Sequence, residues 1–345
     1  MNPPTILPIP VAGLLLGSLT LLSAQTLTWD SDPAAGIQNG SGIWSTAETN
    51  WTDDEGATNV VWSNGSAAAL TGGAKTLTLS GANSVNGITR TGTGETIIIG
   101  TATDTLEVNG VVDAELFLTF RGNDPAAMSG SFEKTGPGQL AMQNTAFNFS
   151  SITLTEGTLT YFFTSPAATT AFALNGGAIG STTTAGRTIG GPVTIGGNVG
   201  IGSDTSPINQ GGAMTLNNTI DLTGGSRTIT TGTGRTTFKG IGAKEGGGSL
   251  FLTAANTLSS VTVNNGIVVG SNGIAFNGTQ GGAFGPGTIT VNNGATLRTT
   301  TVFNIGGQNT TRVLNLVGGA LDLDGAGSGG EYIRTVNMTG GSISS

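Results

Sequence analysis

The sequence predicts an all-β fold: a right-handed parallel β-helix, or β-solenoid, with an N-terminal Trp-rich cap. Three observations predict it. Short segments that alternate apolar residues with Thr or Asn recur, 60 of the 345 residues are Gly, and no stretch after residue 24 keeps a helical apolar period. The right hand follows from the general preference of parallel crossovers. A hairpin-rich β-sandwich uses the same strands and turns, and the near-identical units at coil-like spacing favour the solenoid.

The chain begins with an apolar run from Val11 to Leu22. A run of this length suits the core of a signal peptide and is too short to span a bilayer. We therefore predict a signal peptide over residues 1–24, with Gln25 as the new N-terminus, and export from the cell. No Lys or Arg precedes the run, so a buried apolar segment or a misplaced start codon stays the alternative.

Residues 25–72 form the predicted cap. They contain all four Trp of the chain, six acidic residues and no basic residue. The open edge of a first coil invites strand pairing, and clustered Trp can cover it. A sugar-stacking platform is the alternative use of the four rings, which are Trp29, Trp44, Trp51 and Trp62.

Residues 73–345 carry the repeats of the predicted solenoid. The hexapeptide VTVNNG at Val261–Gly266 returns as ITVNNG at Ile289–Gly294, and each reads as a strand followed by a corner. Related segments align on Ile152, Val193, Met214, Val261, Ile289, Leu314 and Val336. Most gaps are one or two units of roughly 20–28 residues, as solenoid coils require. We expect stacked coils with a continuous apolar column, and Asn ladders at the corners.

Two longer segments carry a resemblance to a known family. Gly138–Phe163 and Gly248–Gly270 share the pattern G-x-L-x-L, a polar turn, then apolar-Thr-apolar-x-x-G. The pattern resembles the autotransporter-associated β-strand repeat, also called the passenger-associated transport repeat. The resemblance implies a secreted or surface-exposed passenger β-helix of a Gram-negative-type bacterium. It also implies export through an outer-membrane translocator barrel that is not in this chain. The repeats stop in mid-pattern at Gly340–Ser345, as a fragment or a truncated relative would.

Composition excludes several kinds of chemistry. The net charge is −8 and the Lys and Arg form no cluster, so nucleic acid is not an expected partner. The chain has no Cys and no His, which removes disulfides, thiol nucleophiles, Ser–His triads and His-ligated metals. We predict no cofactor.

An enzyme of the polysaccharide-cleaving kind needs paired carboxylates, or acidic residues with Ca²⁺ and a base. The densest acidic run after the cap, with its nearby bases, comprises Asp104, Glu107, Asp113, Glu115, Arg121, Asp124, Glu133 and Lys134. Nothing in the spacing places these groups together, and solvated loop charges explain them. We therefore predict no catalytic, cofactor-binding or metal-binding residues.

Two further motifs are weak. Asp322–Glu331 resembles a calcium loop in the alternation of Asp322 and Asp324. However, Ala326 occupies the third ligand position and Glu331 comes too early, so the segment reads as a turn. Gly240–Gly248 lacks the Gly-Lys-Ser/Thr end of a phosphate loop and reads as corner glycines.

The sequence thus predicts a non-catalytic secreted or surface-displayed rod with a structural or adhesive role. Its exposed Thr, Asn and Ser faces would contact other surfaces, with cell-surface or extracellular polysaccharide as the expected partner. The alternative is a carbohydrate-binding or polysaccharide-cleaving β-helix.

Overall fold

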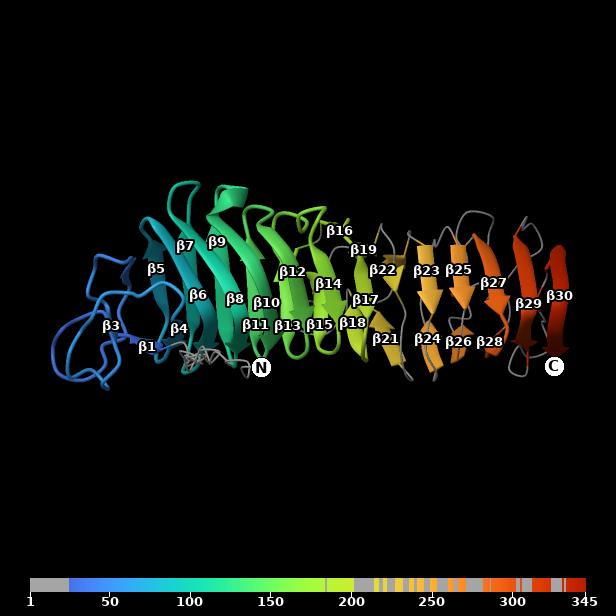
Figure 1. Cartoon of the computed structure of the whole chain (residues 1–345), viewed down its shortest axis with the longest axis horizontal. Coiled ribbons are helices and arrows are strands. Elements are labelled where there is room, and N and C mark those ends of the chain that lie inside the picture. The colour runs from blue at the N-terminus through green and yellow to red at the C-terminus, as the bar shows by residue number, and fades with distance from the viewer. Residues whose placement is uncertain are drawn as a thin grey trace, which may run out of the picture.

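The computed structural model describes residues 25–183 and 185–201 without a break. After residue 201 it describes 214–216, 220–221, 227–231, 236–238, 241–244, 249–252, 260–263, 266–270, 282–285, 287–301, 305, 312–323, 331 and 333–345. The predicted signal peptide, residues 1–24, lies outside the described residues. Figure 1 shows the described strands side by side along one axis, from the blue N-terminal end to the red C-terminal end.

About half of the described strands form one parallel ladder along this axis, here called ladder A. Its strands, in order of pairing, are β1 (Thr26–Trp29), β4 (Ala67–Leu70), β6 (Ala82–Arg90), β8 (Thr105–Ala114), β10 (Met128–Thr135), β12 (Asn148–Leu154), β14 (Ala171–Leu174), β17 (Val193–Ile195), β20 (Ile220–Asp221), β23 (Ile241–Lys244), β25 (Ser260–Val263), β27 (Thr288–Asn292), β29 (Val313–Asp322) and β30 (Thr335–Ser344).

A second parallel ladder, ladder B, takes the strand that follows each strand of ladder A. It contains β2 (Gly42–Trp44), β5 (Lys75–Leu79), β7 (Glu95–Gly100), β9 (Phe117–Gly122), β11 (Gln139–Gln143), β13 (Thr158–Tyr161), β15 (Ala178–Ser181), β18 (Val199–Ile201), β21 (Arg227–Thr231), β24 (Ser249–Leu252), β26 (Gly266–Gly270) and β28 (Ala295–Thr299). The long strands β29 and β30 pass around the corner and close both ladders.

A short third ladder covers part of the middle of the rod. It pairs β16 (Arg187–Ile189), β19 (Met214–Leu216) and β22 (Thr236–Phe238) in parallel. Two small elements complete the described secondary structure: β3 (Trp51–Thr52), which is antiparallel to β1, and the 3₁₀ turn η1 (Pro125–Ala127). The prediction of an all-β parallel solenoid with a Trp cluster at its N-terminal end is confirmed.

The strands form because alternate residues are apolar. In β7 every second side chain is buried, and β27 alternates in the same way. The inward residues of successive coils make one apolar core that runs from Leu27 to Leu321. One coil cannot bury its apolar side alone, so the core exists only because coils stack.

The register confirms most of the alignment made on the sequence. Starting at Ile152, direct partners along ladder A are Phe172, Val193, Ile220, Gly242, Val261, Ile289, Leu314 and Val336. The first three residues of the repeated hexapeptides, Val261–Val263 and Ile289–Val291, therefore lie directly on one another in neighbouring coils, whereas Gly266 pairs with Ala295. The placement of Met214 in this column is wrong. Met214 belongs to β19 in the third ladder, between Arg187 and Thr236.

The two longer repeat segments also match coil for coil. Each runs from ladder B through ladder A and back, as β11–β12–β13 and as β24–β25–β26. The Gly aligned between them, Gly157 and Gly266, both have φ of +69° at the corner. Within the part of the chain that the structure describes, no helix has the length and apolar character needed to cross a membrane.

Candidate functional site

The four Trp side chains pack together at the N-terminal end. Trp51 lies at the centre, with ring centroids 5.2 Å from Trp29, 4.8 Å from Trp44 and 4.5 Å from Trp62. All four side chains are at most 1% exposed. β1 and β2 already pair with the coil strands β4 and β5, and β3 turns back on β1. The cluster therefore closes the first coil, and its buried rings offer no face to a sugar.

The acidic run between β7 and β10 is dispersed over turns and strand faces. Asp104 accepts hydrogen bonds from the Gly81 N–H at 2.8 Å and the Thr101 hydroxyl at 3.0 Å, which hold the pKa of its exposed carboxyl below the usual range. Asp124 accepts from the Ala126 N–H at 2.8 Å and caps η1. Both carboxylates thus order turns, as short acidic side chains do.

The remaining carboxylates of this run also lie apart. Glu107 is opposite Ser129 in the register of β8 and β10, whereas Glu133 is four residues farther along, roughly 13 Å away at strand spacing. The Glu133 carboxylate accepts from the Thr155 hydroxyl at 2.5 Å. Asp113 lies at the end of β8 and Glu115 in the exposed turn after it. Arg121 donates to the Gln143 amide oxygen at 2.9 and 2.7 Å. Asp113 and Glu133 lie on neighbouring strands, two residues apart in register, and the Glu133 carboxylate bonds to Thr155 rather than to Asp113.

Buried cations are the feature that sequence reasoning missed. Lys75, Arg90 and Lys134 are at most 4% exposed, and each lies at the corner where ladder A turns into ladder B. Arg90 donates to the carbonyl oxygens of Leu70 and Gly72 in the preceding coil, and of Thr93 and Gly94 in its own turn. These donors satisfy carbonyls that a tight corner would otherwise leave buried without partners.

Lys134 and Lys75 bridge coils in the same way. The Lys134 ammonium donates to the carbonyl oxygens of Thr135 and Gly136 in its own turn, and of Glu156 in the next coil. Burial lowers the pKa of Lys134 to about 8, against the opposing charges of Asp113 and Glu156. Lys75 donates to the Thr71 carbonyl and, one coil earlier, to the Asn39 amide oxygen at 2.9 Å. Burial and the charge of Arg90 lower the pKa of Lys75 to about 8.

The predicted resemblance of Asp322–Glu331 to a calcium loop does not hold for its two ends. Asp322 is the last residue of β29, and its carboxylate forms an ion pair with the Arg298 guanidinium at 2.8 Å. The Glu331 carboxylate accepts from the Ile305 N–H at 2.9 Å. Asp324 and Ala326 lie outside the described residues. Among the residues that the structure describes, no group of three or more acidic side chains could hold a metal ion.

Of two smaller predictions, one needs correction and the other is met by hydrogen bonds between Asn side chains. Residues 241–244 of the glycine run lie in strand β23, so only the rest of Gly240–Gly248, outside the described residues, is left for a corner. The expected stacking of Asn at corners is seen where the Asn144 amide donates to the Asn123 amide oxygen of the preceding coil at 3.4 Å. A second Asn pair lies within strands: the Asn337 amide donates to the Asn315 amide oxygen at 2.9 Å between β30 and β29. Cross-strand register places these amides together.

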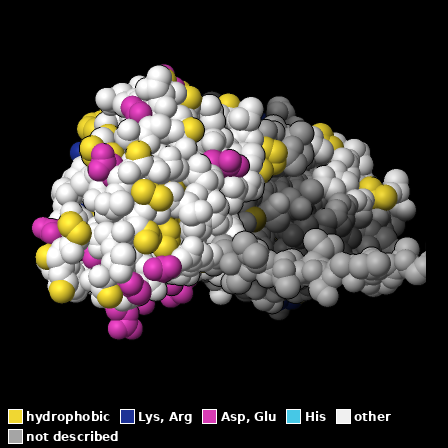
Figure 2. All heavy atoms as spheres, turned by 60° about the vertical axis from the view of Figure 1, so that its left-hand side comes forward, with side chains coloured by type: hydrophobic (Ala, Val, Ile, Leu, Met, Phe, Trp, Pro, Cys, Tyr) yellow, Lys and Arg dark blue, Asp and Glu magenta, His cyan; other side chains and the backbone are white. Residues whose placement is uncertain are grey.

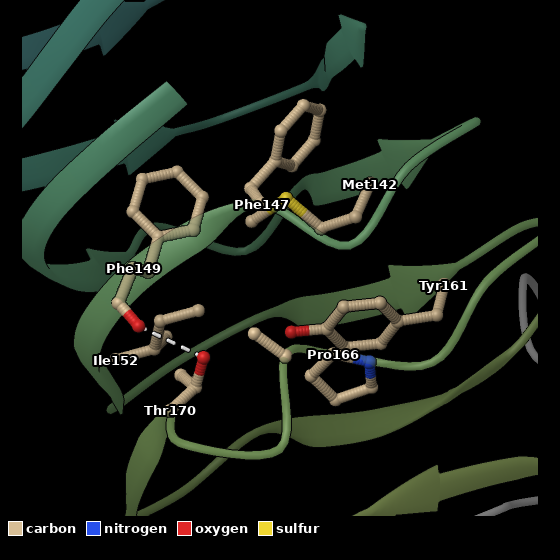
Figure 3. A pocket seen from close by; sticks show the side chains of 8 residues that line it. Met142, Phe147, Phe149, Ile152, Tyr161, Pro166 and Thr170 are labelled. Carbon is tan, nitrogen blue, oxygen red and sulfur yellow. Dashed lines mark hydrogen bonds between the residues drawn. The ribbon is translucent and has the colours of Figure 1, made fainter. Parts of the chain in front are cut away.

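A tight internal cavity lies among β11, β12, β13 and the turn before β14. Its volume is about 10 Å³, and Figure 3 shows it between Met142, Phe149 and Tyr161. The Thr170 hydroxyl donates to the Phe149 carbonyl at its edge, at 2.8 Å. About one water is the most that such a volume holds, far from the roughly 300 Å³ of a small-ligand pocket.

An open groove crosses three coils at the start of ladder B strands. It has a volume of about 400 Å³ and is lined by Glu115, Leu116, Phe117, Pro137, Gly138, Gln139 and Thr158. It combines one carboxylate, one aromatic ring and an amide along the direction of the rod. Groups of these kinds recognise sugars by hydrogen bonding and by apolar contact.

Charge is uneven at the surface of the N-terminal end. Figure 2 shows Asp and Glu side chains spread over this end, with little visible Lys or Arg. Comparison with known proteins adds no assignment: no family model, no curated protein and no solved structure matches the chain.

Proposed function

We propose that the chain is a non-catalytic β-solenoid, secreted or displayed on a cell surface, with a structural or adhesive role. The single observation that carries this proposal is the constant register of ladder A. Val261, Ile289, Leu314 and Val336 lie in one column over successive coils. A fold that adds the same unit repeatedly extends along one axis, and length is what a stalk or display rod supplies.

The charged side chains support a structural role. The buried cations Lys75, Arg90 and Lys134 donate to turn carbonyls, and Asp104 and Asp124 accept from turn N–H groups. Each of these groups has a partner within the scaffold. The rod is thereby held together by burial and hydrogen bonds in a chain without Cys.

The outward side of ladder A supports a contact role. Next to the apolar column, the residues in direct register are Thr153, Ala173, Thr194, Asp221, Ala243, Thr262, Thr290, Asn315 and Asn337. Thr262, Thr290, Asn315 and Asn337 carry hydroxyl or amide groups in four consecutive coils, so at a spacing of about 4.8 Å they present repeated hydrogen-bond donors and acceptors. An extended polysaccharide, which offers hydroxyl groups at regular intervals, is the partner that this row suits.

The export route belongs to the same proposal. The repeat segments that resemble passenger repeats each form one full coil, β11–β12–β13 and β24–β25–β26. This correspondence supports the role of a passenger that is exported by a signal peptide and an outer-membrane translocator. Expression of the gene with an epitope tag, followed by protease treatment of intact cells, tests it. Loss of the tag supports display, and a protected cytoplasmic tag contradicts it.

One experiment tests adhesion and catalysis together. Beads coated with the full chain are washed over glass that carries different acidic and neutral polysaccharides, and new reducing ends are assayed in the same cells. We expect retention of beads on at least one polysaccharide and no new reducing ends. Reducing ends would contradict the non-catalytic role, and no retention on any surface would contradict the adhesive role.

The groove across β9, β11 and β13 favours carbohydrate binding as the second candidate function. Phe117 and Glu115 are the aromatic and acidic groups in it. If the groove holds the sugar, Phe117→Ala weakens bead retention while Thr262→Ala on the outward row does not. The opposite result assigns contact to the row and removes the groove.

A further inference from the structure

Asp30 is a buried carboxylate with one unused oxygen. It follows β1 directly, beside Trp29, and its side chain is 0% exposed. Its Oδ1 accepts hydrogen bonds from the Gln38 N–H at 2.9 Å and from the Asp32 N–H at 3.5 Å. Its Oδ2 is buried and has no hydrogen-bond partner.

Asn59 brings a second oxygen of the same kind to this place. Its amide nitrogen donates to the Asp30 carbonyl oxygen at 3.0 Å, which joins two residues far apart in the sequence. The amide oxygen, Asn59 Oδ1, is also buried without a partner. A buried acceptor without a donor destabilises the fold, and a charged one does so more strongly. Asp30 and Asn59 each carry one such acceptor, and a hydrogen bond joins the two residues. We therefore expect one bound partner to serve both oxygens.

No cation among the residues that the structure describes supplies that partner. Residues 25–72 contain six acidic residues and no Lys, Arg or His. Lys75, the next cation along the chain, gives its ammonium to Thr71 and Asn39. Figure 2 shows acidic side chains spread over this end of the molecule. The local charge is therefore negative, which favours entry of a cation from solution.

We propose that the N-terminal cap binds a calcium ion, with Asp30 Oδ2 and Asn59 Oδ1 among its ligands. Carboxylate, amide and carbonyl oxygens are the ligands that Ca²⁺ prefers, and it accepts irregular geometry completed by water. The site lies outside the Asp322–Glu331 segment that resembles a calcium loop. It uses one buried carboxylate and an amide in place of an acidic cluster.

The ion would tie together the parts of the cap that close the rod. Asp30 leads the loop that returns at Gln38, and Asn59 precedes Val60, whose backbone pairs with Trp51. Calcium sites of extracellular modules bind in the range of about 10⁻⁴–10⁻³ M. A site of this affinity would stabilise the cap outside the cell, where calcium is abundant. The inference does not depend on the proposed adhesive role.

Terbium luminescence tests the site directly. Tb³⁺ replaces Ca²⁺ at oxygen sites and emits when a nearby Trp is excited, and Trp29 adjoins Asp30. With the full chain we expect sensitised emission that Ca²⁺ displaces, and a rise in the melting temperature on replacing EDTA by about 5 mM Ca²⁺. Asp30→Asn should weaken binding at least tenfold, whereas Asp322→Asn should leave it unchanged.

A second variant guards against misfolding of the first. Asn59→Asp adds a charge at the second oxygen and should tighten Tb³⁺ binding, with circular dichroism as the check on folding. A water molecule between Asp30 and the buried indole N–H groups of Trp44 and Trp51, which also lack partners, is the competing explanation. Emission that is absent, or unaltered in both Asp30→Asn and Asn59→Asp, would overturn the calcium site.

Discussion

At the residue scale, the buried cations explain how tight corners are tolerated in this rod. A corner between two parallel ladders leaves carbonyl groups that point at no strand. Arg90 and Lys134 each donate to carbonyls of two neighbouring coils. A Lys whose ammonium is desolvated in the folded state binds its proton less tightly than in the unfolded chain.

This difference predicts a rise in stability with pH. The pKa of Lys75 and Lys134 is about 8 in the fold and ordinarily 10.5. Between these values the unfolded chain binds more protons, so the free energy of unfolding increases as pH rises. Burial raises the pKa of Tyr161 above 10, which reverses the slope at higher pH. We expect urea midpoints to increase from pH 8 to pH 10.

The Lys134→Met variant isolates one of the two contributions. It should retain only the part of the increase that Lys75 produces, while Glu107→Gln, at an exposed strand position, keeps the full increase. Equal slopes in the original protein and in Lys134→Met would contradict the assignment.

The packing of the Trp cluster predicts a large loss of stability when its central side chain is removed. Trp51 contacts the other three indoles and is 0% exposed. Trp51→Ala should lower the free energy of unfolding by about 3–5 kcal/mol, as removal of a large buried aromatic does. Phe163 is 60% exposed. Phe163→Ala should therefore change the free energy of unfolding by less than about 0.5 kcal/mol. Chemical denaturation followed by circular dichroism compares them.

Single residues were the hardest part to predict from the sequence. The clustered Trp in a basic-free segment predicted the cap, because composition alone carries that signal. The partners of Arg90 and Lys134 come from other coils, so a lone cation between apolar residues gives no local sign of its role. A Lys or Arg at an inward position of a strand pattern, just before a Gly corner, is the signal that could have found them.

At the element scale, both copies of the repeated hexapeptide begin in a strand, and the second copy ends in the turn at Asn293–Gly294. Val261 and Val263 are buried, and Thr262 between them is half-buried on the other side. Val261 lies on Ile289 of the next coil. The two faces of the strand therefore differ in burial within a single tripeptide.

Two neighbouring substitutions test this difference. Val261→Asp places a charge in the apolar column and should cost about 4 kcal/mol or more. Thr262→Asp should cost less than about 1 kcal/mol, since Asp221 already occupies the same register position. Thermal unfolding of the two variants provides the comparison, and similar losses in both would contradict the assigned faces.

Alanine substitutions at two corner glycines should differ in their effect on stability. A Cβ on Gly157 would overlap the carbonyl oxygens of Gly136 and Gly138, whereas a Cβ on Gly81 would meet nothing within 4 Å. Both have positive φ, +69° and +71°. Gly81→Ala should cost about 1–2 kcal/mol for the backbone alone. Gly157→Ala should lower the free energy of unfolding by about 3 kcal/mol or more, because the overlap of the Cβ with the carbonyl oxygens is added. Equal urea midpoints for the two variants would contradict this prediction.

Period and spacing were sufficient for the strands but not for the ladder that each one joins. Ile152, Val193, Val261 and Ile289 were aligned correctly because each begins an apolar-Thr-apolar tripeptide within a strand of ladder A. Met214–Leu216 has the same pattern and belongs to the third ladder. Alternation records only that one face is buried. Which ladder a strand joins depends on how many corners precede it in its coil. The length of the loop before the strand does not give that number.

At the scale of the whole molecule, the two ends of the rod differ. β1 and β2 at the N-terminal end are covered by the Trp cluster and by the antiparallel β3. β30 is exposed along its length and continues the apolar columns with Val336 and Ile343. The register of the ladders between these ends is the central claim, since the rod, its core and its outward polar row all follow from it.

Disulfide trapping measures that register most directly, because the chain contains no Cys of its own. Thr262 and Thr290 are direct partners in β25 and β27, about 4.8 Å apart. That separation lies within the roughly 4.4–6.8 Å that a disulfide spans between Cα atoms. Asn315 is one coil farther and beyond this range from Thr262.

We predict that Thr262→Cys/Thr290→Cys oxidises to an internal disulfide, seen as a mass loss of about 2 Da and faster migration on a non-reducing gel. Thr262→Cys/Asn315→Cys should remain reduced under the same conditions. Trapping of the second pair in preference to the first would contradict the stacked register.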